Sequence, residues 1–331
     1  MLLSSKIRIL IPIYLIGLIL LVSCSSNTTQ TPPVAPLASQ TPVPLPMPSG
    51  TGGGVISFVT DRNGGRMDLY IINADGSELT QITYSRGDGI APSWSPDGSK
   101  LAYLVSKNNR LNLYTLDLMA VLADPETDHS VLLLDDSVDS SPPSWSPDGS
   151  AIVFSASQGE NLDLYKINLD GSELTPLTQT NYNEKHPAIS PDGSKLVFSS
   201  NQAGTYDLFL VENLNLADFQ IQDPIQITSG LKDELFPAWS PNSEQILYTT
   251  TENGNKDLVI ISWDGSNTYQ LTDSPADEWK GSWSPDGKQI IYSFFNFDIA
   301  LNDLYIINLE NNSSTPITAD NFDNWWPSWQ P

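Results

Sequence analysis

The stretch PSWSPDGSK, residues 92–100, decides the fold because the chain repeats it. Similar stretches begin, in chain order, at Pro143, Pro187, Pro237 and Gly281. The last five residues of the chain, PSWQP, copy only the opening of the stretch. Successive copies lie roughly 44 to 51 residues apart, a period at which each repeat forms one unit of a larger array.

Each repeat contains four short extended segments separated by turns. The first is the Trp-containing segment itself, which a Pro-Asp-Gly turn ends. An alternating run such as KLAYLV (residues 100–105) reads as a half-buried strand. A third strand such as DLYIINADG (68–76) and a short outer strand such as LTQIT (79–83) follow. No stretch has helical periodicity long enough to matter, so the sequence predicts an all-β fold.

Four antiparallel strands at this period are typical of a propeller blade. Counting them shows that the first unit, from Val55, lacks a first strand, whereas the C-terminal PSWQP is a first strand without a blade. If the two ends pair, residues 55–331 form six complete blades and the ring closes. Such closure leaves no terminal blade with an exposed edge, which would invite aggregation. We therefore predict a six-bladed β-propeller of four-stranded blades.

The tandem pattern WSPDG…DLY…DG…LT resembles the TolB-like propeller family, whose WD40-like PD40 repeats occur in periplasmic proteins and in prolyl-oligopeptidase-type peptidases. The resemblance implies the fold and a place in the bacterial cell envelope. TolB itself carries an additional N-terminal domain that engages partner proteins, and a different segment takes that place here. Ile189 and the Asn242-Ser243 pair depart from the repeat, each in one blade.

The N-terminal segment has the features of an export signal. Lys6 and Arg8 precede an apolar run that is short for a membrane span, and the run ends in Leu-Val-Ser before Cys24. This ending resembles the lipobox of bacterial lipoproteins, which implies that residues 1–23 are a signal peptide and that Cys24 carries diacylglycerol. The alternatives are an uncleaved anchor or an ordinary secretory signal, and each still places the rest of the chain outside the cytoplasm.

Residues 24–54 follow as a Pro-, Ser- and Thr-rich stretch without a charged side chain. Such a segment buries too little apolar area to offset its ordering entropy, so we predict a disordered linker. Cys24 is the only cysteine, so no internal disulfide is expected. The sequence thus predicts a membrane-anchored lipoprotein whose propeller, which we expect to be a monomer, faces the periplasm or the cell exterior.

The charge of the chain limits its partners. Lys and Arg number 15 and Asp and Glu number 39, which gives a formal net charge of −24. Nucleic acid is excluded as a partner, because phosphate binding requires a basic surface. The charge favours cations and basic protein faces, although an acidic surface also simply keeps a protein soluble.

Recurring residues are interpreted first as structural. The tryptophans that occur once per blade are expected to pack between neighbouring blades, and they are Trp94, Trp145, Trp239, Trp283 and Trp329. The aspartates of the Asp-Gly turns are expected to form those turns, and they are Asp97, Asp148, Asp192 and Asp286.

A second regularity stands four residues before the Pro or Gly that opens each repeat. Five carboxylates and one amide occupy these places: Asp88, Asp139, Asn183, Asp233, Asp277 and Asp323. If the side chains point inward, they form an acidic ring at the channel mouth that suits Ca²⁺ or a Lys or Arg side chain of a partner. The alternative is that each one caps its own turn through backbone hydrogen bonds.

Residues beside this ring differ from blade to blade, as a ligand-selecting surface would. The candidate partner contacts are Glu184, His186, Glu234, Trp279, Trp325 and Trp326, and Lys185, Phe236, Glu278 and Lys280 vary in the same way. The three tryptophans can stack on a sugar or a peptide proline, or they can pack beneath a loop.

Nothing in the sequence supplies a catalytic constellation. There is no Gly-x-Ser-x-Gly elbow, and the two histidines, His129 and His186, fall in different blades. We therefore expect a protein that is not an enzyme and has no cofactor beyond the possible Ca²⁺. The favoured function is a lipid-anchored module that binds an envelope protein or peptide through its channel face. The alternative is a receptor for glycans or small ligands, or a degenerate hydrolase-associated propeller.

Overall fold

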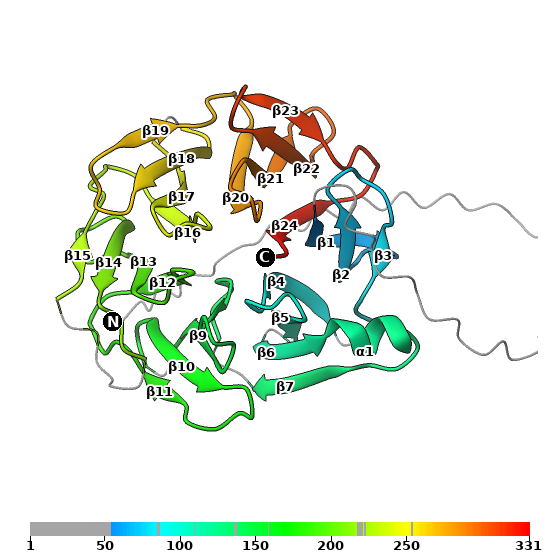
Figure 1. Cartoon of the computed structure of the whole chain (residues 1–331), viewed down its shortest axis with the longest axis horizontal. Helices are drawn as coiled ribbons and strands as arrows, with labels where there is room; N and C mark the ends of the chain where they lie inside the picture. The colour runs from blue at the N-terminus through cyan, green and yellow to red at the C-terminus, as the bar shows by residue number, and fades with distance from the viewer. Residues whose placement is uncertain are drawn as a thin grey trace, which may run out of the picture. The chain divides into compact units, whose positions relative to one another are not determined.

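The computed structural model describes residues 54–84, 87–108, 110–135, 138–157, 159–216, 221, 223–252 and 254–331. Their strands form six separate sheets, each of four antiparallel strands, and the sheets are arranged as blades around a central channel (Figure 1). This confirms the prediction of an all-β, six-bladed propeller. The predicted signal peptide and nearly all of the predicted linker lie outside the described residues.

Every blade is built in the same order from the channel outward. The innermost strands are β24 (Asn324–Trp329), β4 (Asp88–Trp94), β8 (Ser144–Trp145), β12 (Glu184–Ile189), β16 (Glu234–Trp239) and β20 (Asp277–Trp283). The second strands are β1 (Val55–Asn63), β5 (Lys100–Lys107), β9 (Ala151–Ala156), β13 (Lys195–Ser200), β17 (Gln245–Thr250) and β21 (Gln289–Asn296). The third strands are β2 (Arg66–Asn73), β6 (Arg110–Asp117), β10 (Asp163–Asn168), β14 (Asp207–Glu212), β18 (Asp257–Ser262) and β22 (Leu301–Asn308). The outermost strands are β3 (Thr80–Gln81), β7 (Ser130–Leu134), β11 (Thr175–Pro176), β15 (Ile225–Gln226), β19 (Thr268–Gln270) and β23 (Ser313–Pro316).

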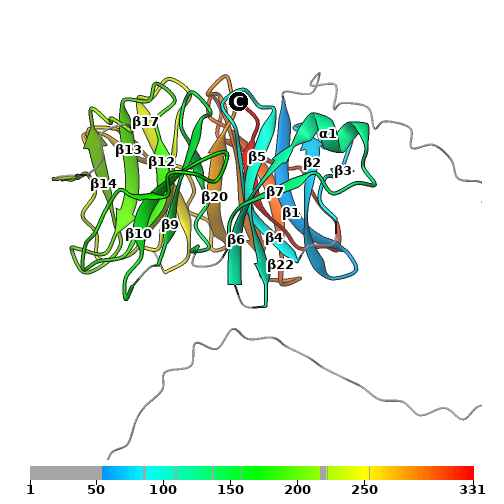
Figure 2. The ribbon, with the colours of Figure 1, turned by 90° about the horizontal axis from the view of Figure 1, so that it is seen from below.

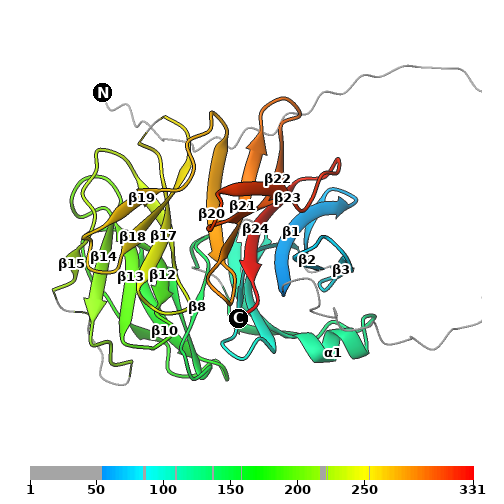
Figure 3. The same cartoon turned by 45° about the horizontal axis from the view of Figure 1, so that its top comes forward.

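The ring closes through the C-terminal strand, as predicted. β24 pairs antiparallel with β1, with Trp329 opposite Ile56, and completes the first blade (Figure 3). Arg62, on β1, reaches the loop before β24, where its Nη2 donates to Asp320 Oδ2 at 3.0 Å and to Asn324 Oδ1 at 2.8 Å. Backbone pairing and a charged side-chain bridge therefore both hold the two ends of the propeller together.

Four of the repeated tryptophans join their own blade to the one before it. The indole N–H of Trp94 donates to the carbonyl of Ser328, and that of Trp145 donates to the carbonyl of Ser93, both at 3.0 Å. Trp239 and Trp283 make the equivalent bonds, at 2.8 and 3.1 Å. The rings themselves are at most 8% exposed and belong to apolar clusters shared by two blades. The predicted packing between blades is thus observed, and each ring adds a hydrogen bond to its buried apolar area.

The Asp-Gly turns behave as predicted. Asp97 Oδ1 accepts from the backbone N–H of Ser99 at 3.0 Å and from the hydroxyl of Ser95 at 2.6 Å, and Gly98 adopts a φ of +68°. These hydrogen bonds favour the charged form and lower the pKa of Asp97 to about 2. The same arrangement recurs at the other three aspartates of this type. These carboxylates are therefore occupied by their own turns.

One short helix differs from the sequence-based expectation. Helix α1 (Leu118–Ala123) follows β6 and lies at the rim of the second blade (Figure 2). Asp117 caps it by accepting from the N–H of Ala120 at 3.1 Å, while Leu118, Val121 and Leu122 are buried. Six residues are too few to show helical periodicity in a sequence. Within the described part of the chain, no helix is long and apolar enough to cross a membrane.

Replacing the closing tryptophan tests the ring. Trp329 is 4% exposed and packs with Ile56 and Ile291, while its indole nitrogen has no hydrogen-bond partner. Trp329→Ala is expected to lower the free energy of unfolding by about 3–5 kcal/mol, because it opens a cavity at the seam. Urea denaturation measures this loss, and Leu231→Ala, at an 86% exposed side chain, is the control. Equal effects of the two substitutions would contradict the closure role.

Candidate functional site

The innermost strands share a β-bulge that brings a side chain into the channel. In five blades the pairing of the innermost strand with the second strand shifts register at the same place. One residue at each shift has a φ between +52° and +57°, and these residues are Ala91, His186, Phe236, Lys280 and Trp326. Positive φ is costly for residues with a Cβ, and bulges commonly re-aim a side chain. We call these five the bulge positions; Pro142 holds the equivalent sequence position in the third blade.

Aromatic rings from four blades meet inside the channel. The ring of Phe236 lies 4.1 Å from that of His186 and 5.5 Å from that of Trp326, measured between centroids. Phe236 and Trp326 belong to the fifth and first blades, which are not neighbours, so their contact crosses the channel. Trp279 packs on both Phe236 and Trp326 at 5.8 and 5.6 Å, and on Trp325 at 6.3 Å. We call these five residues the channel aromatic cluster.

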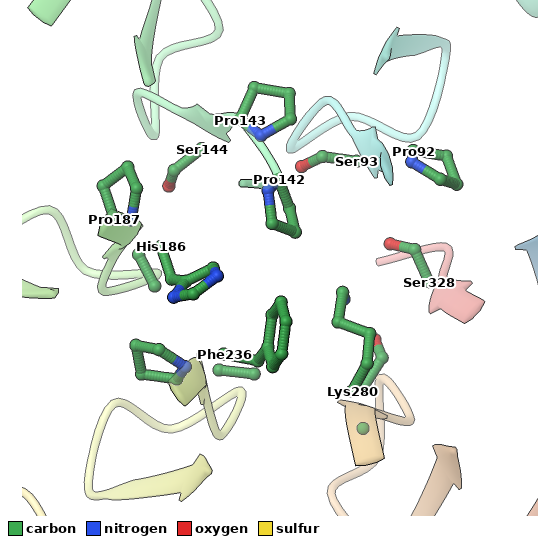
Figure 4. A pocket seen from close by; sticks show the side chains of 15 residues that line it. Pro92, Ser93, Pro142, Pro143, Ser144, His186, Pro187, Phe236, Lys280 and Ser328 are labelled. Carbon is green, nitrogen blue, oxygen red and sulfur yellow. The ribbon is translucent and has the colours of Figure 1, made fainter. Parts of the chain in front are cut away.

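A pocket of about 140 Å³ lies in the channel beside this cluster. Its lining comes from the bulge positions, their equivalent Pro142 and the residues just after them: Pro92, Ser93, Pro142, Pro143, Ser144, His186, Pro187, Ala188, Phe236, Pro237, Ala238, Lys280, Gly281, Ser282 and Ser328. The side chains of His186, Phe236, Lys280 and Pro142 converge on it (Figure 4). The pocket therefore occupies the half of the channel toward the C-terminal ends of the innermost strands.

Two titratable groups of this pocket are buried. Lys280 is 9% exposed, and burial lowers the pKa of its ammonium group to about 8. Its Nζ donates to the carbonyl of Pro327 at 3.5 Å. Burial, with the positive charges of Lys185 and Lys280, holds the pKa of His186 well below 6.5, and its Nδ1 has no partner. At neutral pH the pocket therefore presents a neutral imidazole beside a lysine that is still mostly protonated.

The residues proposed as an acidic ring mostly cap strands of the preceding blade. Asp233 Oδ1 accepts from the N–H of Tyr206 at 3.2 Å, Asp277 Oδ1 from that of Lys256 at 3.0 Å, and Asp323 Oδ1 from that of Asn302 at 2.8 Å. Asp88 and Asn183 make the same kind of bond at 3.3 and 2.9 Å. Asp139 instead accepts from Ser141 Oγ at 2.5 Å.

This arrangement differs from the capping alternative considered for the ring. The side chains cap the start of a neighbour's third strand rather than their own turn. Among the described residues, no group of three or more His, Cys, Asp or Glu is placed to hold a metal ion. The Ca²⁺ hypothesis thus stays a prediction, and the observed hydrogen bonds give these oxygens a structural use.

Three glutamates sit one position further along the innermost strands. Glu184, Glu234 and Glu278 are 2%, 7% and 3% exposed. Glu184 accepts from the hydroxyls of Thr178 at 2.8 Å and Thr180 at 2.6 Å, which follow β11, the outer strand of the preceding blade. Burial raises the pKa of Glu184 and of Glu234 to about 7, against hydrogen bonds that lower it. Glu184 and Glu234, proposed as partner contacts, are therefore enclosed at the junction between blades.

A family model described as the TolB beta propeller domain, PD40, matches residues 50–331. This chain belongs to that family. The PD40 propeller is also similar to two curated relatives. It is 30% identical to the protein TolB homolog of Chlorobaculum tepidum over 127 residues, which is 38% of this chain and 27% of that protein. It is 27% identical to the Tol-Pal system protein TolB of Francisella tularensis subsp. mediasiatica over 236 residues, which is 70% of this chain and 52% of that protein.

A solved structure agrees with this assignment at the level of the fold. The crystal structure of TolB from Acinetobacter baumannii superimposes with a TM-score of 0.71 at 22% identity, covering 85% of this chain and 67% of that one. The match to the two curated relatives spans about a quarter and about half of their lengths. The PD40 propeller is thus the part that these proteins share.

Of the remaining predicted contacts, Trp279, Trp326 and His186 are buried and Trp325 is half-buried. Trp279 and Trp326 are each 8% exposed, and Trp279 Nε1 lies 3.4 Å from Asn302 Oδ1. These rings pack edge to face in the channel aromatic cluster, so packing is the interpretation that the geometry favours. His186 is also buried, but it lines the pocket. Cys24, the proposed lipidation site, lies outside the described residues.

Phe236 and Lys280 line the pocket, which the sequence did not predict. Their positions in the repeat place them beside the acidic ring, whereas the bulge turns them toward the pocket. A signal for this exists in the sequence. The position just before the Pro or Gly of each repeat holds Ala, Pro, His, Phe, Lys and Trp in turn, while its neighbours repeat. Variation at one position of a regular repeat marks a place where the fold does not dictate the side chain.

The buried glutamates predict a pH-dependent stability. The pKa of Glu184 and of Glu234 lies near 7 in the folded protein and near 4.5 in the unfolded chain, so folding favours the protonated carboxyl. The resulting stabilisation is complete below about pH 4.5 and is lost as pH rises through 7. The free energy of unfolding of the parent, measured by urea denaturation, is expected to fall between pH 5 and 8. Glu234→Gln is expected to make this fall smaller by about 1–3 kcal/mol. The exposed Glu126→Gln is the control, and an unchanged pH profile in Glu234→Gln would contradict the assignment.

Proposed function

We propose that this protein is a lipid-anchored propeller of the bacterial cell envelope that binds a protein or peptide segment in its channel. The observation that carries the proposal is the pocket at the centre of the ring. Its floor is a packed aromatic cluster, and its walls are prolines and serines contributed by all six blades. A preformed concavity on which a few polar groups converge is a common form of binding site.

The size of the pocket favours a side chain over a larger ligand. Sites for drug-sized ligands span about 300–1,000 Å³, whereas this pocket measures about 140 Å³. One side chain or a chain end fits such a volume, and the surrounding propeller face can contact the rest of a peptide. Glycan binding, the alternative function, has less support because Trp279 and Trp326 are buried and already pack edge to face against each other.

Binding is favoured over catalysis by the state of the histidines. The ring of His186 lies 4.1 Å from that of Phe236, measured between centroids. His129 is in a different blade from His186, and its Nε2 contacts the carbonyl of Asp124. Neither has a serine or carboxylate arrangement that would make it a general base. We therefore propose a role without catalysis.

The proposed location rests on the sequence and the family. Residues 1–24 resemble a lipoprotein signal ending in Cys24, and one relative is a Tol-Pal system protein. Acyl chains on Cys24 would supply the membrane affinity, since each buried methylene contributes roughly 0.8 kcal/mol. The uncharged linker would let the propeller reach a partner in the envelope.

Filling the pocket tests the binding role. Ala238→Trp places a large side chain in the pocket lining, and Ala203→Trp, at an exposed turn, is the matched control. The parent and Ala203→Trp are expected to capture the same envelope proteins on cross-linking. Ala238→Trp is expected to capture them in at least about tenfold lower yield, because the bulky ring occludes the site. Equal capture by all three proteins would contradict a channel site. Capture of glycans instead of proteins would favour the alternative function.

Removing the cysteine tests the anchor. Cys24→Ser cannot form the thioether to diacylglycerol, so the protein is expected to move from the detergent-rich to the aqueous phase in Triton X-114 partitioning. The parent protein should also incorporate labelled palmitate, and the variant should not. A variant that stays in the detergent-rich phase would instead indicate an uncleaved N-terminal anchor.

A further inference from the structure

The lysine of the channel pocket is a buried cation without an anionic partner. Lys280 is 9% exposed, and no carboxylate in the described residues forms an ion pair with it. Its neighbour Lys256, by contrast, pairs with Asp277 at 3.5 Å. Within the described residues, Lys280 Nζ makes a single long hydrogen bond, to the carbonyl of Pro327. Buried charges in proteins are normally paired, so the site lacks a counter-ion.

The walls of the pocket contain no competing negative charge. None of the lining residues is Asp or Glu. Ser144 and Ser282 accept through Oγ from the backbone N–H groups of Ile189 and Trp329, at 2.9 and 3.0 Å. A hydroxyl that accepts a hydrogen bond still has its own hydrogen to donate. The pocket therefore offers hydrogen-bond donors and one ammonium group around an unoccupied volume.

We propose that this pocket binds a carboxylate of the partner, either an Asp or Glu side chain or a chain terminus, with the Lys280 ammonium as its counter-ion. The inference rests on the proposed function and names the chemistry that the partner must supply. A carboxylate completes the missing ion pair with charge-assisted hydrogen bonds, which are the stronger kind. The apolar floor formed by Phe236 and Pro142 accommodates the methylene groups that carry it (Figure 4).

The overall charge of the protein does not exclude this partner. The formal charge of −24 led to the expectation of a cationic ligand. The residues of the proposed acidic ring, however, lie at the opposite ends of the innermost strands from the pocket, and their oxygens accept hydrogen bonds there. Exposed charges are largely screened beyond about 8 Å at physiological salt. The local ammonium therefore governs which group is accepted inside the pocket.

Pocket size favours a protein carboxylate over an acidic sugar. A uronic acid presents a carboxylate on a full ring that belongs to an oligosaccharide, whereas an Asp or Glu side chain is narrow. The volume of about 140 Å³ suits the narrow group. Binding of acidic oligosaccharides through Lys280 would therefore overturn the peptide assignment.

The experiment uses the full-length chain and two matched peptide libraries. One library contains Asp and Glu with free C-termini, and the other has Asn and Gln in their place with C-terminal amides. The proteins compared are the parent, Lys280→Met, Lys280→Arg and the pocket-filling Ala238→Trp. Peptides that the parent retains and Ala238→Trp does not are expected to come from the acidic library. Their affinity should fall at least about tenfold in Lys280→Met and less in Lys280→Arg.

The outcomes separate this inference from the proposed function. Channel-dependent binding that is equal for the two libraries, or unchanged in Lys280→Met, would overturn the carboxylate assignment and leave a peptide-binding module. A complete absence of channel-dependent peptide binding would overturn both. In a last experiment the protein is titrated with glutarate and with its diamide, and tryptophan fluorescence reports binding. A response to glutarate that depends on Lys280, without peptide binding, would assign the pocket to small carboxylates instead. Urea denaturation verifies that Lys280→Met is folded.

Discussion

The pairing of β24 with β1 is the constraint on which the rest of the structure depends. Each blade buries its apolar faces only against its two neighbours, so an open ring would expose two faces. With the ends joined, Trp329 fills the last junction, and Arg62 reaches the loop that leads into the closing strand. A channel of fixed width exists only because this seam is shut. The pocket and the aromatic cluster, which contact several blades at once, follow from it.

The blades are joined at three levels along the channel. At one end of the innermost strands, Asp or Asn side chains accept from backbone N–H groups of the preceding blade. At the other end, the repeated indoles donate to backbone carbonyls of the preceding blade. Between them, buried glutamates and threonine hydroxyls form further bonds across one junction. Part of the acidic character of the chain is thus used in holding the ring together, and the net charge by itself is a poor guide to the ligand.

The sequence predicts those features that local chemistry determines. Asp97 and Gly98 specify their turn within a few residues, and the alternation of KLAYLV specifies a half-buried strand. Counting repeats then gives the number of blades and the closure. The six-residue helix after Asp117 escaped prediction because so short a segment has no period. The pattern also gave no sign that Asp88 caps Met67, because the donor lies in another blade and becomes a neighbour only when the ring forms.

The bulge explains why the candidate site was only partly predicted. A shift of one residue exchanges the two faces of a strand, and nothing in the hydrophobic pattern around Lys280 shows that the shift occurs there. His186 was identified as a candidate, but its place in the channel rather than at the mouth depends on the same shift. The partners of these side chains, such as Phe236 for Trp326, come from different blades. Their meeting therefore depends on the complete ring.

The common backbone of the bulge positions has an evolutionary consequence. Ala91, His186, Phe236, Lys280 and Trp326 differ in size, polarity and charge, yet they share nearly the same φ. The main-chain conformation there is thus independent of what it displays. Mutation can exchange one of these side chains without disturbing the scaffold, and each exchange alters one sector of the channel wall. Descendants of such a ring can acquire new recognition preferences by single steps while keeping the same framework.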